Sequence, residues 1–229
     1  MTLLMSMMVI IMRTDVILTI KNTLEDMKGI TTLSLNTDDS EKVIFGIYVN
    51  DIRNSLSFLS LPEEHIETTI DGINIQFFEL GAVLHNIYFN GALSFIDILY
   101  PNDEIMQPSE EYFNLCVEIA EHLPFHIAKF NYIQSIQNFR YEDDNEQVLI
   151  LTEIMRSFVF SLKNNSEYDP GDYTYIKKIE SEADFVSACN ELNKFQQWLN
   201  GINFKKVSEK DLNRINDLYM DIQIMHMKV

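Results

Sequence analysis

The sequence predicts an α+β protein, in which a small mixed β-sheet half is followed by an α-helical half. Helical and strand patterns alternate from about residue 14 to residue 100, whereas nearly all of the chain from Ser109 onward has the periodicity of amphipathic helices. Tyr100-Pro101 lies between these two regimes, where proline interrupts the helical pattern. We therefore expect an α/β domain over residues 14–105 and a helical domain over residues 106–229.

The first half is expected to contain four strands and several helices. Apolar residues at helical spacing indicate the helices, and β-branched runs bounded by turn residues indicate the strands. The expected elements are a helix over 15–28, strands over 31–35, 43–49, 66–70 and 73–77, a short helix from Asn50-Asp51 to Pro62, and helices over 78–89 and 93–99. Asp71-Gly72 is a strong signal for a tight hairpin. Polar residues 36–40 are expected to form the turn of the first hairpin.

The second half is expected to consist of amphipathic helices joined by polar linkers. The helices are expected over residues 109–122, 124–141, 146–162 and 183–199, with a last one after Ser208. Ser208 followed by Asp211 fits a sequence that caps a helix N-terminus, although Glu or Gln is commoner at the second position.

The strong acidic excess limits the partners of the chain. It has 17 basic and 35 acidic side chains, which give a formal net charge of -18. Such a chain repels phosphate backbones, so we expect no direct nucleic-acid binding. A protein partner with a basic surface fits this charge, and so does an acidic inhibitor that mimics nucleic acid.

Cysteine and hydropathy patterns favour a cytoplasmic protein without a metal or membrane site. Cys116 and Cys189 lie far apart and are expected to be reduced core thiols. His122 and His126 have the spacing of a metal pair, but Pro124 between them interrupts the helix that would align them. The apolar N-terminal run of about a dozen residues is shorter than the roughly 20 needed to span a bilayer.

Several short segments together carry a resemblance to a known family. They are a polar turn at Leu35–Ser40, the motif Phe45-Gly46-Ile47-Tyr48 in the next strand, Glu79-Leu80-Gly81-Ala82, Asn90-Gly91 with Asp97, and Arg156 in a later helix. In this order the chain resembles the DNA polymerase β-like nucleotidyltransferase superfamily, in particular its predicted stand-alone bacterial and phage members. The likeness covers residues 14–200, and none of its motifs is intact.

The resemblance implies a metal site that has lost most of its ligands. Nucleotidyl transfer uses two divalent ions held by closely spaced carboxylates. The three corresponding positions are Glu41, Val43 and Asn74, so only Glu41 retains a carboxylate that could bind magnesium. Because valine offers no ligand and asparagine only a neutral oxygen, none of these positions is a confident catalytic residue.

The nucleotide-binding positions implied by the resemblance are Gly29, Ile30 and Glu79. Ile30 stands where the relatives have a phosphate-binding serine, and Gly81-Ala82 stand where they have Arg-Lys. The loss of groups on both the metal side and the phosphate side points to a protein without catalytic activity.

Three functions from different classes follow. The first is an inactive nucleotidyltransferase-fold protein that needs no cofactor and binds a protein partner or a nucleotide. A composition rich in Asn and Ile suits a phage or mobile-element source. The second is an atypical Mg-dependent nucleotidyltransferase that uses Glu41 with Asp38, Asp39 or Asn74. The third is an acidic inhibitor or nucleic-acid mimic.

Overall fold

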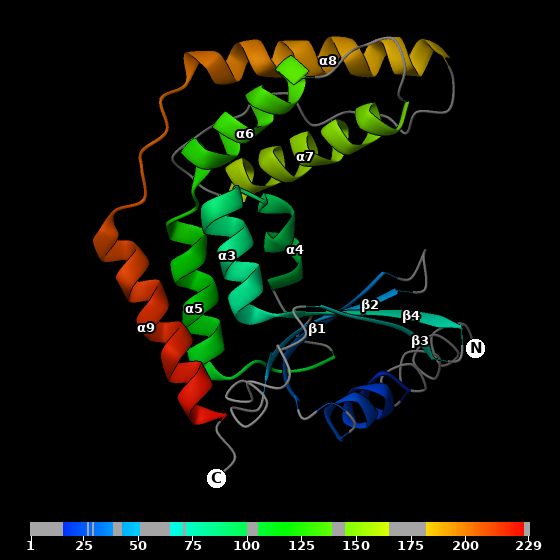
Figure 1. The fold of residues 1–229 in the computed structure, drawn as a ribbon, viewed down its shortest axis with the longest axis vertical. Coiled ribbons are helices and arrows are strands. Elements are labelled where there is room, and N and C mark those ends of the chain that lie inside the picture. The colour runs from blue at the N-terminus through cyan, green and yellow to red at the C-terminus, as the bar shows by residue number, and fades with distance from the viewer. Residues whose placement is uncertain are drawn as a thin grey trace, which may run out of the picture. The chain divides into compact units, whose positions relative to one another are not determined.

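The computed structural model shows an α+β fold, in which a small four-stranded sheet is followed by helices (Figure 1). It describes residues 16–26, 28, 30–38, 43–50, 65–70, 72–99, 105–138, 145–164 and 182–226. Residues 16–26 form a first helix. The strands are β1 (Ile30–Asp38), β2 (Val43–Asn50), β3 (His65–Ile70) and β4 (Ile73–Glu79). The later helices are α3 (Leu80–Asn90), η1 (Leu93–Phe95), α4 (Ile96–Leu99), α5 (Glu110–Glu121), α6 (Phe125–Asn138), α7 (Asn145–Asn164), α8 (Glu182–Gly201) and α9 (Glu209–Met225).

The sheet joins two antiparallel pairs through a parallel one. Its strand order is β1-β2-β4-β3, with β1 antiparallel to β2, β2 parallel to β4, and β4 antiparallel to β3. Both hairpins expected from the sequence therefore form. The parallel pairing of β2 with β4 makes the sheet mixed and places β2 and β4 at its centre.

The first hairpin differs from the sequence prediction in the length of its strands. Residues 36–38 were assigned to the turn, but they continue β1 and pair with residues 43–45 of β2. The prediction was wrong here because cross-strand pairing overrides the turn preference of Asn and Asp. Residues 39–42, and the short helix expected between Asp51 and Pro62, lie outside the described residues.

One face of the sheet packs on the helix over residues 16–26 (Figure 1). Ile17, Ile20 and Leu24 follow helical spacing and meet Ile44 and Ile75 from the central strands, all of them buried. Apolar burial of this kind supplies the main stabilisation of the sheet.

A buried hydrogen-bond network connects β1 to α4 and α5. The Tyr112 hydroxyl lies 2.7 Å from the Leu99 carbonyl oxygen, to which it donates, and 3.3 Å from the Ser34 hydroxyl. Tyr112 and Ser34 are both fully buried. Because unpaired polar groups are costly in the core, this network fixes which residue of β1 faces the helices.

The helical core around α6, α7 and α8 is built from aromatic rings. Tyr132 meets Phe195 edge-on at 5.3 Å between ring centroids, and Phe158 meets Phe195 edge-on at 5.7 Å. Phe125 lies 5.7 Å from Phe158 and 5.5 Å from Phe204. Such tilted and edge-on contacts are the favoured geometries of aromatic pairs.

The chain forms two compact units that interleave along the sequence. The first comprises residues 1–83, 97–117 and 214–229, and the second comprises residues 84–96 and 118–213. The division into domains 14–105 and 106–229 stays a prediction about which segments fold independently.

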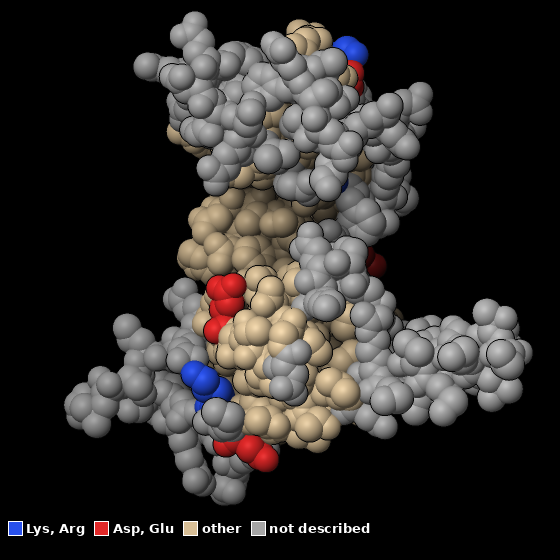
Figure 2. Space-filling model, turned by 90° about the vertical axis from the view of Figure 1, so that its right-hand side faces the viewer, with Lys and Arg blue, Asp and Glu red and all other residues tan. Residues whose placement is uncertain are grey.

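On the face drawn in Figure 2, few of the described charged side chains are clustered. Acidic and basic side chains stand there as separate groups within a largely uncharged area. Among the described helices, we find none with the length and apolar character needed to cross a membrane.

Candidate functional site

The sheet register brings two of the predicted metal-site positions together. Val43 of β2 pairs directly with Asn74 of β4. Val43 also pairs with Asp38 of β1, and Asn74 with Thr69 of β3, so the four residues form one row across the sheet. Directly paired residues project from the same face of a sheet. The row therefore holds the two predicted metal-site positions, Val43 and Asn74, that the structure describes.

The side chains of this row that the structure describes, those of Val43, Asn74 and Thr69, offer little to a cation. Val43 is buried with 6% of its surface exposed, whereas Asn74 is exposed. The Thr69 hydroxyl donates a hydrogen bond of 3.1 Å to the Asn74 side-chain oxygen. The one ligand atom that Asn74 could offer thus already accepts a hydrogen bond. Two divalent ions need several anionic oxygens, which Val43 and Asn74 do not supply.

The neighbouring row adds polarity but only one carboxylate. It comprises Asn36, Phe45, Gln76 and Glu67, in strand order. Glu67 is exposed, on the edge strand. The described side chains of this row can form hydrogen bonds, but its single exposed carboxylate, Glu67, is a weak cation ligand.

Glu79, predicted to bind nucleotide, caps a helix in the structure. It is the last residue of β4, and its carboxylate oxygen Oε2 accepts a 2.8 Å hydrogen bond from the backbone amide of Ala82 in the first turn of α3. The first amides of a helix lack partners within the helix, and a carboxylate there is also favoured by the helix dipole. The structural role accounts for Glu79 without a ligand.

A tyrosine from α9 occupies the space in front of this cap. A Cβ atom added at Gly81 would lie 2.7 Å from the Tyr219 hydroxyl and 2.9 Å from Glu79 Oε2. Burial, with a smaller effect of the Glu79 charge, raises the pKa of Tyr219. Any side chain at position 81 would have to displace Tyr219, so an arginine, which the resemblance implies at this position, has no room here.

The remaining predicted positions divide into one core residue and two that lie outside the described part. Ile30 is buried, with 3% of its surface exposed, and belongs to the core beneath the sheet. Its apolar side chain contributes packing and has no group that binds phosphate. Gly29 and Glu41 lie outside the described residues, so their predicted roles in nucleotide and magnesium binding stay predictions.

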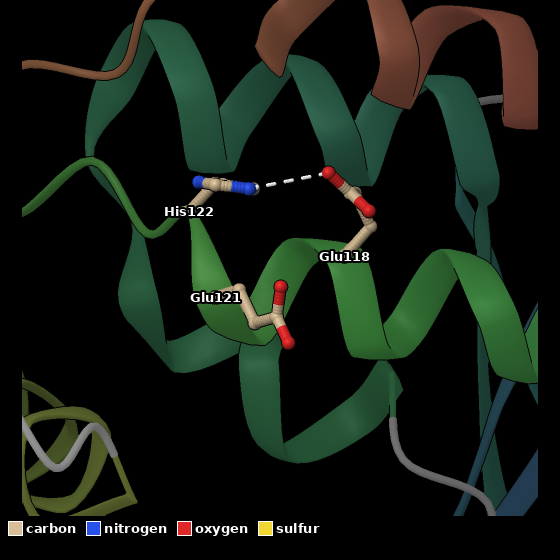
Figure 3. A group of neighbouring side chains, drawn as sticks. All are labelled: Glu118, Glu121 and His122. Carbon is tan, nitrogen blue, oxygen red and sulfur yellow. Dashed lines mark ion pairs between the residues drawn. The ribbon is translucent and has the colours of Figure 1, made fainter.

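The structure also shows a charged cluster at the end of α5 that the sequence analysis missed. His122 Nε2 lies 3.2 Å from a Glu118 carboxylate oxygen, and His122 Nδ1 lies 3.8 Å from Asp211. Figure 3 shows the imidazole and the Glu118 carboxylate pointing toward one another, with Glu121 nearby on the same helix. The sequence feature that could have predicted this cluster is the i,i+4 spacing of Glu118 and His122, which places both side chains on one helix face.

This cluster is better suited to an ion pair than to a metal. Glu118, Glu121 and His122 could each offer a ligand atom, and these atoms lie within 4.8 Å of one another. Both ring nitrogens of His122, however, already face a carboxylate.

Asp211 is held in place by the helix cap that the sequence predicts. The Ser208 hydroxyl donates a 2.6 Å hydrogen bond to the Asp211 carboxylate, and the Asp211 amide donates back to that hydroxyl at 3.2 Å. The bond from the Ser208 hydroxyl is the main cause that lowers the pKa of Asp211. The capping prediction for α9 is confirmed.

Both cysteines are free and buried, as the sequence predicts. Burial raises the pKa of the Cys116 thiol to about 12. Burial also raises the pKa of Cys189. Because the thiolate is the reactive form, neither side chain is suited to nucleophilic or redox chemistry.

Comparisons with known proteins add no relative to this picture. No protein-family model, no curated protein and no solved structure matches the chain.

Proposed function

We propose that this chain is a nucleotidyltransferase-like protein without catalytic activity, which acts by binding a protein partner in the cytoplasm. The pairing of Val43 with Asn74 is the observation that carries this proposal. A transferase of this kind needs carboxylates at both positions to hold two cations. The chain instead has a buried valine beside an amide that is hydrogen-bonded to Thr69.

The charge of the chain favours a protein over a nucleotide as the ligand. A net charge of -18 repels triphosphates, and no arginine stands at position 81 to offset that repulsion. Aromatic side chains are enriched in protein interfaces, and Phe89 and Phe130 in the helical unit each expose 66% of their surface.

The absence of catalysis can be tested by calorimetric titration with the four nucleoside triphosphates, each with and without magnesium, together with an assay for nucleotide transfer. We expect neither magnesium-dependent binding nor transfer. Magnesium-dependent binding that Glu41→Ala abolishes would overturn the proposal in favour of the atypical transferase.

The binding role needs a separate experiment. Proteins captured from the source cell by the full chain should be purified and recombined with it, and a complex should form from the pure components. Phe130→Ser is the interface variant, and Val186→Ser is a matched control because Val186 is also an exposed apolar residue of a helix in the same unit. Failure of every purified candidate to form a complex would contradict the proposal that the chain binds a protein partner.

A further inference from the structure

The helical unit contains a pocket that none of the predicted site residues touches. Its volume is about 520 Å³, and it lies between the end of α3, η1, α6 and α7. All of its described lining residues belong to the second compact unit. Pockets that hold small molecules typically measure about 300–1,000 Å³, and an engineered cavity of about 150 Å³ already binds benzene.

The lining of this pocket is apolar with a few neutral polar groups. Leu93, Ile150, Ile154 and Phe158 supply apolar surface. The polar groups come from asparagine and serine, among them Ser157. None of the described lining residues carries a charge. A small number of neutral hydrogen-bonding groups in an apolar wall can orient a ligand but cannot neutralise an anion.

The floor of the pocket is part of the rigid aromatic core. Tyr132 and Phe158 both line the pocket, and each packs edge-on against Phe195, at 5.3 Å and 5.7 Å between ring centroids. Tyr132 and Phe158 are each only 1% exposed. Closely packed aromatic side chains cannot move into the empty volume without losing these contacts, so the cavity does not close by collapse.

The wall between α3 and α6 is fixed by two contacts. Gly91 has a φ of +62°, and a Cβ atom there would lie 2.6 Å from the backbone nitrogen of Ala128. The Asn131 side-chain amide donates a 2.6 Å hydrogen bond to the Asn90 carbonyl oxygen. The close approach of Gly91 to Ala128 and the hydrogen bond from Asn131 to Asn90 hold the segment before η1 against α6. The pocket is therefore preformed.

The side of the pocket on α7 exposes apolar surface to solvent. Ile150 and Ile154 are one helical turn apart and expose 53% and 38% of their surfaces. Leaving two adjacent isoleucines exposed beside an empty apolar volume costs hydrophobic free energy that an apolar ligand would recover.

We infer that this pocket binds a neutral, largely apolar small molecule that carries at least one hydrogen-bonding group. The volume fits a molecule of two or three rings, the walls match its apolar surface, and the serine and asparagine groups match its polar group. Nucleotides and other phosphorylated compounds do not suit this pocket, because none of its described lining residues is a cation and the chain is acidic. This site is independent of the proposed function.

The inference can be tested with N-phenyl-1-naphthylamine, a neutral fluorescent probe with one N–H group, titrated into the full chain. We expect saturable binding of one probe per chain. The sulfonated relative 8-anilinonaphthalene-1-sulfonate is the anionic control, and we expect it to bind at least about tenfold more weakly because nothing offsets its charge.

Substitutions in the pocket separate this site from other apolar surfaces. Ile150→Lys puts a charge on the lining, and Ile154→Trp fills the volume without adding a charge. Each should weaken probe binding at least about tenfold. The matched control is Val186→Lys, because Val186 is 55% exposed on α8 and does not line the pocket. Circular dichroism confirms that each variant folds.

Three results would overturn the inference. The first is no saturable binding of the neutral probe to the native chain. The second is equal binding to the native chain and to both folded pocket variants, which would put the probe elsewhere. The third is sulfonate binding as tight as that of the neutral probe, which would refute the proposed ligand class.

Discussion

Val43 and Asn74 are direct partners across the parallel β2–β4 pair, yet one is buried and the other is exposed. The two positions therefore tolerate a carboxylate very differently. Val43→Asp would bury an unpaired charge and should lower the free energy of unfolding by about 2–4 kcal/mol at pH 7, whereas Asn74→Asp should change it by less than about 0.5 kcal/mol.

Urea unfolding of both variants checks this prediction. The pKa of the new carboxyl at position 43 should be raised by burial, so the loss should shrink as the pH falls and the group becomes protonated. Equal stability of the two variants at pH 7 would mean that position 43 is open to solvent and able to hold a cation.

The second prediction concerns Gly81, which lies against Glu79 and Tyr219. Alanine is a better helix former than glycine by about 0.5–1 kcal/mol. At Gly81, however, the added Cβ would crowd the Tyr219 hydroxyl and the Glu79 carboxylate. Gly81→Ala should therefore be neutral or destabilising in the native chain and should become more favourable, by at least about 0.5 kcal/mol, in a Tyr219→Phe background.

A double-mutant cycle by thermal unfolding measures this coupling. Glu79→Gln serves as the control for charge at the α3 cap, since it keeps a side-chain oxygen for the Ala82 amide. Additive effects of Gly81→Ala and Tyr219→Phe would show that the hydroxyl does not limit position 81.

The order of helices and strands followed from the sequence because local signals agree with the fold. As the sequence pattern predicts, β3 ends just before the turn at Gly72 and α3 ends just before Gly91, and Ser208 caps the N-terminus of α9. The parallel pairing of β2 with β4 had no such signal, because pairing between strands that are distant along the chain depends on the whole sheet.

The candidate site was harder to predict than the fold. Periodicity could not reveal that Glu79 caps α3 or that Tyr219 fills the space beside Gly81, since both contacts depend on tertiary packing. The pairing of His122 with Asp211 joins residues 89 positions apart and has the same cause. The pocket beside Ile150 was missed because single exposed isoleucines look like ordinary surface residues.

Glu25 provides a pH-dependent prediction for the sheet half. Its carboxylate accepts a 2.7 Å hydrogen bond from the Thr32 amide, at the irregularity in the β1–β2 register, and pairs with Lys21 at 3.0 Å. Burial tends to raise the pKa of Glu25, but the Thr32 amide and Lys21 outweigh it, so the pKa is lowered. The stabilisation is therefore present above the ordinary carboxyl pKa and is lost as the pH falls through the lowered one.

Glu25→Ala should lower the free energy of unfolding by about 1–2 kcal/mol at pH 7. Denaturant unfolding of the native chain and Glu25→Ala at pH 7 and pH 3 should give a smaller difference at the lower pH. Glu25→Gln is the control, because it removes the charge but keeps an oxygen for the Thr32 amide. A pH-independent difference would contradict the assigned role of the charge.

Cys116 gives a prediction about reactivity that also reports on the integrity of the core. Its Sγ lies 3.7 Å from the Leu99 carbonyl oxygen, and burial raises the pKa of the thiol to about 12. At pH 8 the folded chain therefore holds almost no Cys116 thiolate, and a disulfide reagent such as 5,5′-dithiobis(2-nitrobenzoic acid) should react far more slowly than with free cysteine. In guanidinium chloride both thiols should react fast, and a Cys189→Ser variant assigns the slow phase. Rapid labelling of folded Cys189→Ser would show that the contacts joining α5 to Leu99 open readily in solution.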